Sequence, residues 1–401
     1  MSFNYLSEVW EKSLKKIIAE GNYREINSFQ QLVKNNKNFI DFSSNDYLDL
    51  RNNKSIIDAG HRSALKNGAG SGSSRLVLEL DQNISLLENY FSEKTEFRYS
   101  IFFPSGFVAN AALFDALSLF QWEEQEKQNI HYFIDHRCHA SLFYGLKNAN
   151  VYSDFFRHND YMHLEHKLLH SVAPVKIVVI ESLYSVDGDF SDPQALLQLC
   201  EKYNLLIIID ETHTVGTYGK SRTWLQAYSF LKPYILASMS GCGKAIGVAG
   251  GFLATDHYQL KERIIQKSKL LINSTAVSPF VTGAVQKSLE IIYSSEGLNL
   301  ITKLHENISY LRDRLAEFSE NESEFNFDIF DFSKQRSNIF PLVYKYHWEI
   351  KQKEKYFIEN GLILKALRPP TVPKGTSRFR VILKSSHSRN DIDMLVEFLK
   401  K

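Results

Sequence analysis

Short apolar runs alternate with helical patterns through the middle of the chain, and this alternation predicts an α/β fold. Strands that are apolar on both faces are typical of a mostly parallel sheet with helices on each side. We therefore expect a large domain built on a mixed, mostly parallel sheet. The predicted strands are 101–103, 132–134, 177–180, 205–209, 234–237 and 250–254.

The clearest helix lies between the predicted strands at 177–180 and 205–209. Residues 193–203 place their apolar side chains on one helical face. Asp192 suits the N-cap because its carboxylate accepts from free amides, and Pro193 suits the first helical position because that position needs no amide hydrogen. A helix of this kind between two strands is what a parallel pair requires.

Both ends of the chain differ from this middle region. Residues 5–36 have an amphipathic helical pattern with a break near Gly21, and a short strand follows at 39–42. A long helical region, 283–318, leads into a smaller α+β unit. The predicted elements of that unit are a charged loop or edge strand at 320–334, strands at 338–343 and 379–383, and a helix at 390–400. The predicted division is an N-terminal segment, a large domain and a small C-terminal domain, at 1–50, 51–285 and 286–401.

The 401 residues have an ordinary globular composition, with 44% hydrophobic and 23% charged residues. The net charge of +1 gives no reason to expect nucleic acid or an anionic membrane as a partner. We see no signal-peptide pattern and no apolar run long enough to span a bilayer. Three cysteines without paired spacing suit a reducing compartment. We expect a cytoplasmic protein without stable membrane insertion.

Lys244 stands in a run of small residues, 240–247, between the predicted strands at 234–237 and 250–254. Burial disfavours the charged form of an amine and lowers its pKa. A neutral lysine there is able to form a Schiff base with a carbonyl compound. A lone lysine in a loop is more often an exposed surface residue, so the neighbouring strand ends decide between the two interpretations.

Five predicted strands are followed by polar, titratable or glycine-turn residues. In open α/β sheets, ligands bind beyond the carboxyl ends of the strands. If these five segments converge on one rim of the sheet, they form one site. The segments are 104–110, 135–141, 181–189, 210–213 and 240–247.

An aromatic aldehyde phosphate such as pyridoxal 5′-phosphate gives these segments chemical roles. Lys244 supplies the amine. Asp210 follows an apolar strand, and a buried carboxylate needs a positive partner such as a protonated pyridine nitrogen, which keeps the ring an electron sink. His213 is placed to reach the ring hydroxyl, and His139 to lie on the ring face. Taken singly, a strand-end aspartate is usually a turn or capping residue, and His139 a structural histidine.

The sequence also predicts a binding position for the phosphate group. Ser105, Gly106 and Phe107 open a predicted helix over 108–119, and a helix N-terminus with free amides binds phosphate. Seen alone, the same residues form an ordinary turn. The loop 68–74 has the composition of a phosphate loop, but it lacks the lysine of the nucleotide motif.

The run Asp187-Gly188-Asp189 raises the possibility of a metal loop. The residues that follow lack the ligand spacing and the terminal glutamate of a calcium loop. We therefore interpret this run as a turn that helps to cap a helix, and we expect no metal site.

Eight short motifs are spread over most of the chain, at 42–48, 70–76, 105–110, 139–142, 156–160, 184–189, 210–213 and 243–247. Together they resemble the α-oxoamine synthase family. The resemblance implies a fold-type I enzyme, with the aminotransferase class I/II fold, that depends on pyridoxal phosphate. It also implies that the enzyme condenses an amino acid with an acyl thioester and releases carbon dioxide.

The resemblance assigns roles to single residues around the ring. It makes Lys244 the Schiff-base residue and the proton carrier at the amino-acid α-carbon, and Asp210 the partner of the pyridine nitrogen. His213 and Ser185 would lie at the ring hydroxyl. His139 would stack on the ring and polarise the thioester carbonyl.

The resemblance also implies how the substrates bind. Arg380 would hold the amino-acid carboxylate in a fork geometry, with Asn45 beside it. Ser274 and Thr275 would reach the phosphate of a neighbouring subunit, which implies a homodimer with shared active sites.

The motif at 367–380, which includes the expected substrate contact Thr371, is most similar to the 8-amino-7-oxononanoate synthases, a branch of the family in biotin biosynthesis. Some positions depart from the family pattern. Gly241 stands where a phosphate-binding Ser or Thr is usual, so Ser240 or Ser238 is the expected replacement, and Ser240 is the one we place at the cofactor. Thr212 stands where a small residue is usual, and 78–84 replaces a glycine- and histidine-containing run.

The predicted reaction is the decarboxylative condensation of L-alanine with a pimeloyl thioester, carried by CoA or by a carrier protein. The alternatives are a sister reaction, in which glycine meets acetyl-CoA or serine meets a long-chain acyl group, a plain aminotransferase, or a non-catalytic partner subunit of the same fold.

Overall fold

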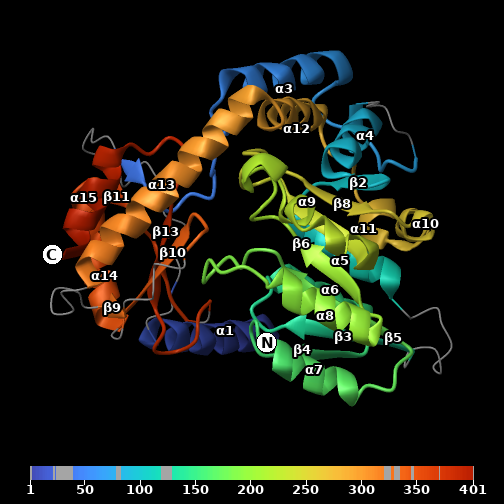
Figure 1. Cartoon of the computed structure of the whole chain (residues 1–401), viewed down its shortest axis with the longest axis horizontal. Helices are drawn as coiled ribbons and strands as arrows, with labels where there is room; N and C mark the ends of the chain where they lie inside the picture. The colour runs from blue at the N-terminus through green and yellow to red at the C-terminus, as the bar shows by residue number, and fades with distance from the viewer. Residues whose placement is uncertain are drawn as a thin grey trace.

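The computed structural model describes residues 2–20, 23, 39–77, 83–118, 129–319, 327–328, 335–344, 347–369 and 371–400. Within these residues, a large sheet with its helices occupies one side of the molecule and a smaller α+β unit occupies the other (Figure 1). The long helix α13 (Ser295–Ser319) runs from the large part to the small part.

Seven strands form the large sheet in the order β2-β8-β7-β6-β5-β3-β4. The pairs from β7 through to β4 are parallel, and β8 runs antiparallel to both of its neighbours. The predicted mixed, mostly parallel sheet is therefore confirmed. The strands are β2 (Tyr99–Phe103), β3 (Ile130–Asp135), β4 (Ser153–Phe156), β5 (Val175–Glu181), β6 (Leu206–Asp210), β7 (Ile235–Gly241) and β8 (Gly251–Thr255).

Helices cover both faces of this sheet, and this explains why its strands are continuously apolar. In β5, Val178 and Ile180 belong to the core on one face, together with α8 and α12. Ile177 and Val179 belong to the core on the other face, together with α5 and α6. The edge strand β4 is half exposed and carries no apolar run, so the sequence pattern missed it.

The helices of the large part follow the strands closely along the chain. The prediction for 193–203 is confirmed, because Asp192 caps α8 by accepting from the amides of Gln194 and Ala195. These helices are α3 (Lys54–Asn67), α4 (Asn83–Thr95), α5 (Gly106–Leu117), α6 (Ala140–Ala149), α7 (Tyr161–Leu169), α8 (Pro193–Tyr203), α9 (Trp224–Ala227), α10 (Tyr258–Lys267), α11 (Lys269–Ile272) and α12 (Pro279–Ile292), with short 3₁₀ turns at Gly219–Ser221 and Ser229–Tyr234.

The long helical region predicted at 283–318 is two helices, α12 and α13. The chain turns between them, and Gly297 passes so close to the end of α12 that a Cβ there would lie 2.3 Å from the carbonyl oxygens of Ile291 and Ile292. The helical spacing of apolar residues does not reveal this turn, because that spacing continues in the helices on both sides of it.

The small part contains a four-stranded antiparallel sheet in the order β12-β13-β10-β9. Its predicted strands and last helix are confirmed. In the region 320–334, only β9 is described, and it is an edge strand as one of the two interpretations expected. The elements are β9 (Phe327–Asp328), β10 (Ile339–Tyr344), α14 (His347–Glu359), β11 (Leu362–Ile363), β12 (Ala366–Leu367), β13 (Arg378–Ile382) and α15 (Arg389–Lys400), and β1 (Ile40–Asp41) pairs with β11.

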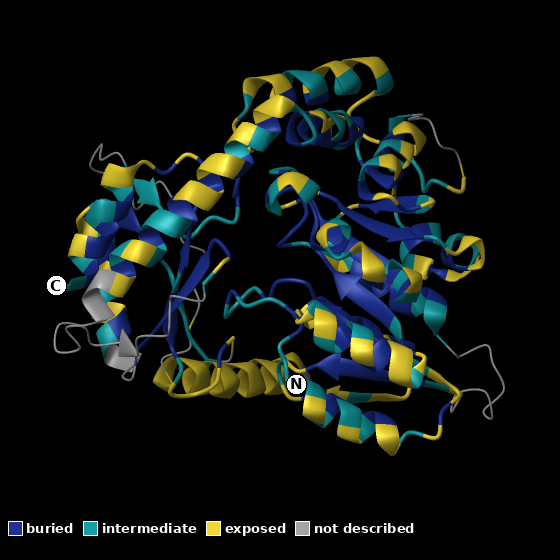
Figure 2. Cartoon of the chain, viewed as in Figure 1, coloured by how far each residue is buried: buried dark blue, intermediate teal, exposed yellow. Residues whose placement is uncertain are grey.

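The helix α1 (Ser2–Ala19) is exposed along its described side chains (Figure 2). The rest of the predicted helical segment, including the break near Gly21, lies outside the described residues. The domain boundaries at 50 and 285 stay predictions. None of the helices in the described part of the chain combines the length and the apolar character that a bilayer crossing needs.

Candidate active site

The five polar strand ends meet at one edge of the large sheet, as the sequence predicted. Each of them contributes to a cavity of about 230 Å³. The lining residues are Pro104, Ser105, Gly106, Phe107, Asn110, His139, Ser141, Glu181, Asp210, Thr212, His213, Gly241, Gly243, Lys244, Ala249 and Gly250.

Lys244 lies in the loop that joins β7 to β8. The Cys242 amide donates to the carbonyl of Gly250 at 2.9 Å, and the Val248 amide donates to the carbonyl of Cys242 at 3.2 Å, so the loop is closed at its base. Burial, together with the nearby charge of Arg380, holds the pKa of the Lys244 amine below its ordinary value. The lowered pKa makes the neutral amine, which is the nucleophilic form, easier to reach than in a solvated lysine.

Asp210 ends β6, and its side chain is only 6% exposed. Its carboxylate accepts from the side-chain amide of Asn110 at 2.8 Å and from the backbone amide of Thr212 at 2.8 Å. Among the described residues, no lysine, arginine or histidine nitrogen forms an ion pair with it within 4.0 Å. A buried carboxylate held only by neutral donors suits a cationic ligand atom, and the protonated ring nitrogen of pyridoxal phosphate is such an atom.

His213 lies three residues beyond Asp210 and is buried. Its Nδ1 lies 2.5 Å from the hydroxyl oxygen of Tyr47. Burial and the nearby charges of Lys244 and Arg380 hold the pKa of His213 well below its usual value. The imidazole is therefore neutral at pH 7, and it can exchange hydrogen bonds with a hydroxyl without adding charge to the cavity.

His139 caps α6 and remains exposed within the cavity. Its Nδ1 lies 2.7 Å from the hydroxyl of Ser141, which accepts a 2.8 Å bond from Asn110. Because Asn110 also donates to Asp210, a chain of hydrogen bonds links His139 to the strand-end carboxylate. The ring of Phe107 meets His139 edge-on, with 6.4 Å between ring centroids.

The N-terminus of α5 forms one end of the cavity. Ser105 caps the helix by accepting from the Val108 amide at 3.2 Å. Gly106 packs directly on two other glycines, because a Cβ on Gly251 would lie 2.6 Å from the Gly106 nitrogen and a Cβ on Gly106 would lie 3.0 Å from the Cα of Gly241. Glycines let the backbones approach and leave free amides facing the cavity, which is how phosphate is commonly held.

Arg380 lies on β13, in the small part of the molecule. Its guanidinium donates to the carbonyl of Ser185 at 2.9 Å and to the side-chain oxygen of Asn45 at 3.3 Å. The structure thus brings together Arg380, Asn45 and Ser185 as a group. This group is close enough to the cavity for the charge of Arg380 to lower the pKa values of Lys244 and His213.

Three predicted contacts lie elsewhere in the structure. Ser240 is buried in β7 and does not line the cavity, because it points to the opposite face of the strand from Gly241. Thr275 is exposed and lines a smaller neighbouring depression. Thr371 is exposed in a turn of the small part. Their predicted contacts stay predictions.

Sequence reasoning gave no role at the site to Asn110, Glu181 or Tyr47, and it named Thr212 only as a departure from the family pattern, although all four lie at the site. Glu181 accepts the backbone amide of His139, and burial and the charge of Asp210 raise its pKa well above the ordinary value. Each of these residues stands within or next to a strand-end segment or motif. Only the folded chain shows that their side chains turn inward.

The run at 187–189 belongs to an ion-pair cluster beside the site. His158 contacts Asp135 at 3.1 Å and Asp189 at 2.8 Å, so both of its ring nitrogens are occupied. Asp187 pairs with Arg137 and Arg378. Although burial opposes the charge, the hydrogen bonds and charges of the two aspartates raise the pKa of His158 to about 9. Ligand atoms of His158, Asp187 and Asp189 lie within 4.8 Å of one another, and all three side chains form ion pairs.

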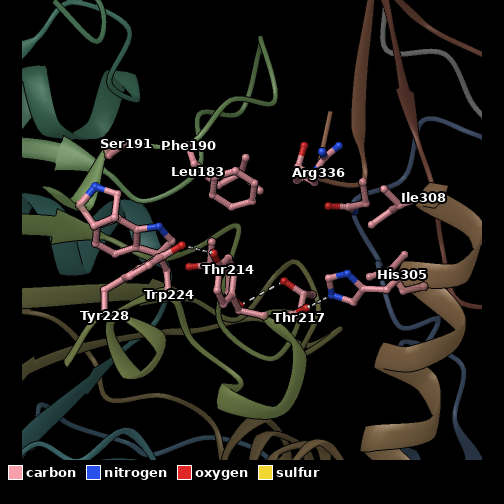
Figure 3. Close-up of a pocket in the computed structure, with 15 residues that line it drawn as sticks. Leu183, Phe190, Ser191, Thr214, Thr217, Trp224, Tyr228, His305, Ile308 and Arg336 are labelled. Carbon is pink, nitrogen blue, oxygen red and sulfur yellow. Dashed lines mark hydrogen bonds between the residues drawn. The ribbon is translucent and has the colours of Figure 1, made fainter. Parts of the chain in front are cut away.

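A second, larger cavity of about 420 Å³ lies between the turns of the large part and α13 (Figure 3). Its walls are mostly aromatic and aliphatic, with Trp224 and Phe190 on one side and Ile308 on the other. At its floor, Nε2 of His305 lies 2.8 Å from the carbonyl oxygen of Thr217. Thr214, the residue after His213, lines this cavity.

Comparison with known proteins places the chain in a broad family. Residues 37–399 match the family model "Aminotransferase class I and II". The chain is 31% identical to an 8-amino-7-oxononanoate synthase of Polaromonas naphthalenivorans over 90% of this chain and 87% of that protein. It is 29% identical to a 5-aminolevulinate synthase of Rickettsia prowazekii over 98% and 92%. Its fold resembles a serine palmitoyltransferase from S. paucimobilis with a TM-score of 0.81 at 21% identity, over 91% of this chain and 87% of that one.

Proposed function

Because the chain belongs to the aminotransferase class I and II family of pyridoxal-phosphate-dependent enzymes, we propose that it catalyses the decarboxylative condensation of an amino acid with an acyl thioester. The observation that carries this proposal is the presence, in one cavity, of a lysine whose pKa is lowered by burial and of a buried carboxylate that forms no ion pair with any described residue.

Bound pyridoxal phosphate supplies an electron sink that stabilises negative charge at the α-carbon of the amino acid. The residues of the chain then hold it in place. Asp210 would pair with the ring nitrogen, the amides of Gly106 and Phe107 would hold the phosphate, and Lys244 would supply the amine for the aldehyde. His213 and Tyr47 form a neutral hydrogen-bonded pair for the ring hydroxyl.

Arg380 is the proposed anchor for the amino-acid carboxylate. Its guanidinium is already oriented by Ser185 and Asn45, so little side-chain freedom remains to be lost when the substrate binds. Lys244 would also be the base that takes the proton from the α-carbon. Its lowered pKa suits a base that must be neutral near physiological pH.

Condensation forms a bond between the α-carbon and the acyl carbonyl carbon, and the thiol leaves with a proton. The carboxylate then leaves as carbon dioxide, and a proton takes its place at the α-carbon. His139 is the proposed donor to the thioester carbonyl, because it is exposed in the cavity while its Nδ1 is held by Ser141. Lys244 returns the proton to the α-carbon.

L-alanine and a pimeloyl thioester are the proposed substrates, with 8-amino-7-oxononanoate as the product. The motif at 367–380 and the identity to the Polaromonas protein support this choice. The similarity to a 5-aminolevulinate synthase supports the broader reaction class with other substrates. We also propose a homodimer, in which Thr275 of each subunit serves the phosphate site of the other.

Two measurements on the purified protein test the proposal. Borohydride reduction after incubation with pyridoxal phosphate should place the label on the peptide that contains Lys244. Mixing the loaded protein with alanine, glycine or serine and a set of acyl-CoA and acyl-carrier-protein thioesters should give carbon dioxide and one aminoketone by mass. Amino transfer to an oxoacid without carbon dioxide would identify an aminotransferase instead, and a protein that binds no cofactor would be a non-catalytic subunit.

A further inference from the structure

Thr212 and Gly241 face each other at the phosphate end of the cavity. Thr212 lies in the turn after β6, Gly241 ends β7, and both line the cavity. The Gly241 amide donates to the Thr212 hydroxyl oxygen at 2.8 Å. The N-terminus of α5 adjoins them, because a Cβ on Gly106 would lie 3.0 Å from the Cα of Gly241 and 4.0 Å from the Oγ1 of Thr212.

These two positions compete for the same space. A Cβ on Gly241 would lie 2.9 Å from the Cγ2 of Thr212 and 3.1 Å from its Oγ1, closer than packed side chains approach. The family pattern to which this chain is similar has a hydroxyl residue at the position of Gly241 and a small residue at that of Thr212. This chain has the opposite arrangement, and glycine at 241 makes room for the threonine.

The Thr212 hydroxyl has a proton to donate. Its oxygen accepts from the Gly241 amide, and among the described residues its own hydrogen meets no acceptor. A hydroxyl can accept and donate at once. Beside the free amides of Gly106 and Phe107, this donor is suited to an anionic oxygen, where a hydrogen bond is strongest.

The backbone amide of Thr212 contacts Asp210, at the end of the cavity opposite the proposed phosphate position. The Thr212 amide donates to Asp210 at 2.8 Å, while its side chain lines the phosphate end. We infer that the Thr212 hydroxyl binds a phosphate oxygen of pyridoxal phosphate, in place of the hydroxyl that Gly241 lacks. This inference rests on the proposed function and identifies Thr212, instead of the buried Ser240, as the replacement.

The test compares two ligands that differ only in the phosphate. Dissociation constants of the apoenzyme are measured by equilibrium dialysis, for pyridoxal phosphate and separately for pyridoxal. Thr212→Val keeps the shape but removes the hydroxyl. It should weaken pyridoxal phosphate roughly ten- to hundredfold, as expected for a hydrogen bond to a charged group, and change pyridoxal binding by less than about threefold.

Two matched variants complete the test. Thr212→Ser keeps the hydroxyl and should bind the phosphate form within about threefold of the natural protein. The double change Thr212→Ala with Gly241→Thr moves the hydroxyl to β7 and should recover most of the loss. Equal weakening of both ligands by Thr212→Val would overturn the inference, because the effect would then pass through Asp210, and so would no weakening of either. If the natural protein binds neither ligand, the proposed function fails instead.

Discussion

The larger of the two cavities has the less polar lining, and the smaller one holds more titratable side chains. The larger one, about 420 Å³, is lined mostly by carbon atoms, and its described lining holds neither a lysine nor a carboxylate. The smaller one, about 230 Å³, holds Lys244, Asp210 and Glu181 within the reach of His139 and His213. Volume alone therefore does not locate the chemistry. Converging titratable groups do, among them Lys244 and His213, whose pKa values are lowered by burial, and Glu181, whose pKa is raised by burial.

Only a short turn separates the two cavities. His213 lines the smaller one and Thr214 lines the larger one. The hydroxyl groups of Thr214 and Ser182 lie 2.7 Å apart and join the turn after β6 to the end of β5. If only the smaller cavity carries out the chemistry, changes to the residues that line it should abolish or weaken turnover. Changes to the residues that line the larger cavity should hardly affect it.

The largest effect is expected for Lys244→Ala. The variant loses both the covalent attachment to the cofactor and the base at the α-carbon, so turnover should fall by at least about a thousandfold. Steady-state product formation measures the loss, and mass mapping after borohydride reduction should show no label. Lys232→Ala is the matched control, since Lys232 also has a pKa lowered by burial but lies outside the smaller cavity. Normal turnover in Lys244→Ala would remove this residue from the mechanism.

Arg380→Lys should have the next largest effect. A lysine keeps the charge but loses the fork that binds a carboxylate at two points. We expect KM for the amino acid to rise roughly ten- to hundredfold, with the dissociation constant of pyridoxal phosphate nearly unchanged. Initial rates at varied amino-acid concentration measure the first quantity, and dialysis measures the second. A fall in cofactor affinity without a change in KM would place Arg380 at the cofactor instead.

The ion-pair cluster of His158 lies beside the smaller cavity, and its contribution to stability can be tested. Its folded-state pKa of about 9 is raised above the ordinary 6.5, so its charged contacts stabilise the fold fully below pH 6.5, and this contribution is lost as the pH rises through about 9. At pH 7, His158→Asn should lower the free energy of unfolding by about 2 kcal/mol. Denaturant unfolding at several pH values checks this. A difference between variant and natural protein that widens toward pH 10 would contradict the assignment.

The smallest effect is expected in the larger cavity. Leu304→Phe adds volume where space is available, so strain should be small. We expect kcat/KM to stay within about threefold of the natural value, and thermal unfolding to change little. A fall in kcat/KM as large as the one expected for Arg380→Lys would show that the larger cavity takes part in the reaction.

Local signals were sufficient for much of the fold. The helix over 193–203 follows from Asp192 and Pro193, because capping depends on neighbours in the chain. Apolar runs were sufficient for the central strands for the same reason. The split between α12 and α13, and the edge strand β4, were not predictable in this way, because a close backbone contact at Gly297 and a half-exposed edge leave no apolar pattern.

At the candidate site, the types of residue and their order could be read from the chain, since Lys244, Asp210, His213 and His139 all follow apolar runs. The directions in which the side chains point could not be read from the chain. Ser240 and Gly241 are adjacent, yet only Gly241 faces the cavity, because successive residues of a strand point to opposite faces.

The chain by itself determined an α/β fold and a set of strand ends rich in lysine, aspartate and histidine, because periodicity and turn chemistry act over a few residues. The tertiary structure alone decided that Thr212 occupies the space left by Gly241, that Asn110 joins Asp210 to Ser141, and that Arg380 comes to rest near Lys244. These contacts join residues that lie from 29 positions apart in the chain, for Thr212 and Gly241, to 136 positions apart, for Lys244 and Arg380. Their geometry is therefore set by how the sheet and its turns pack together.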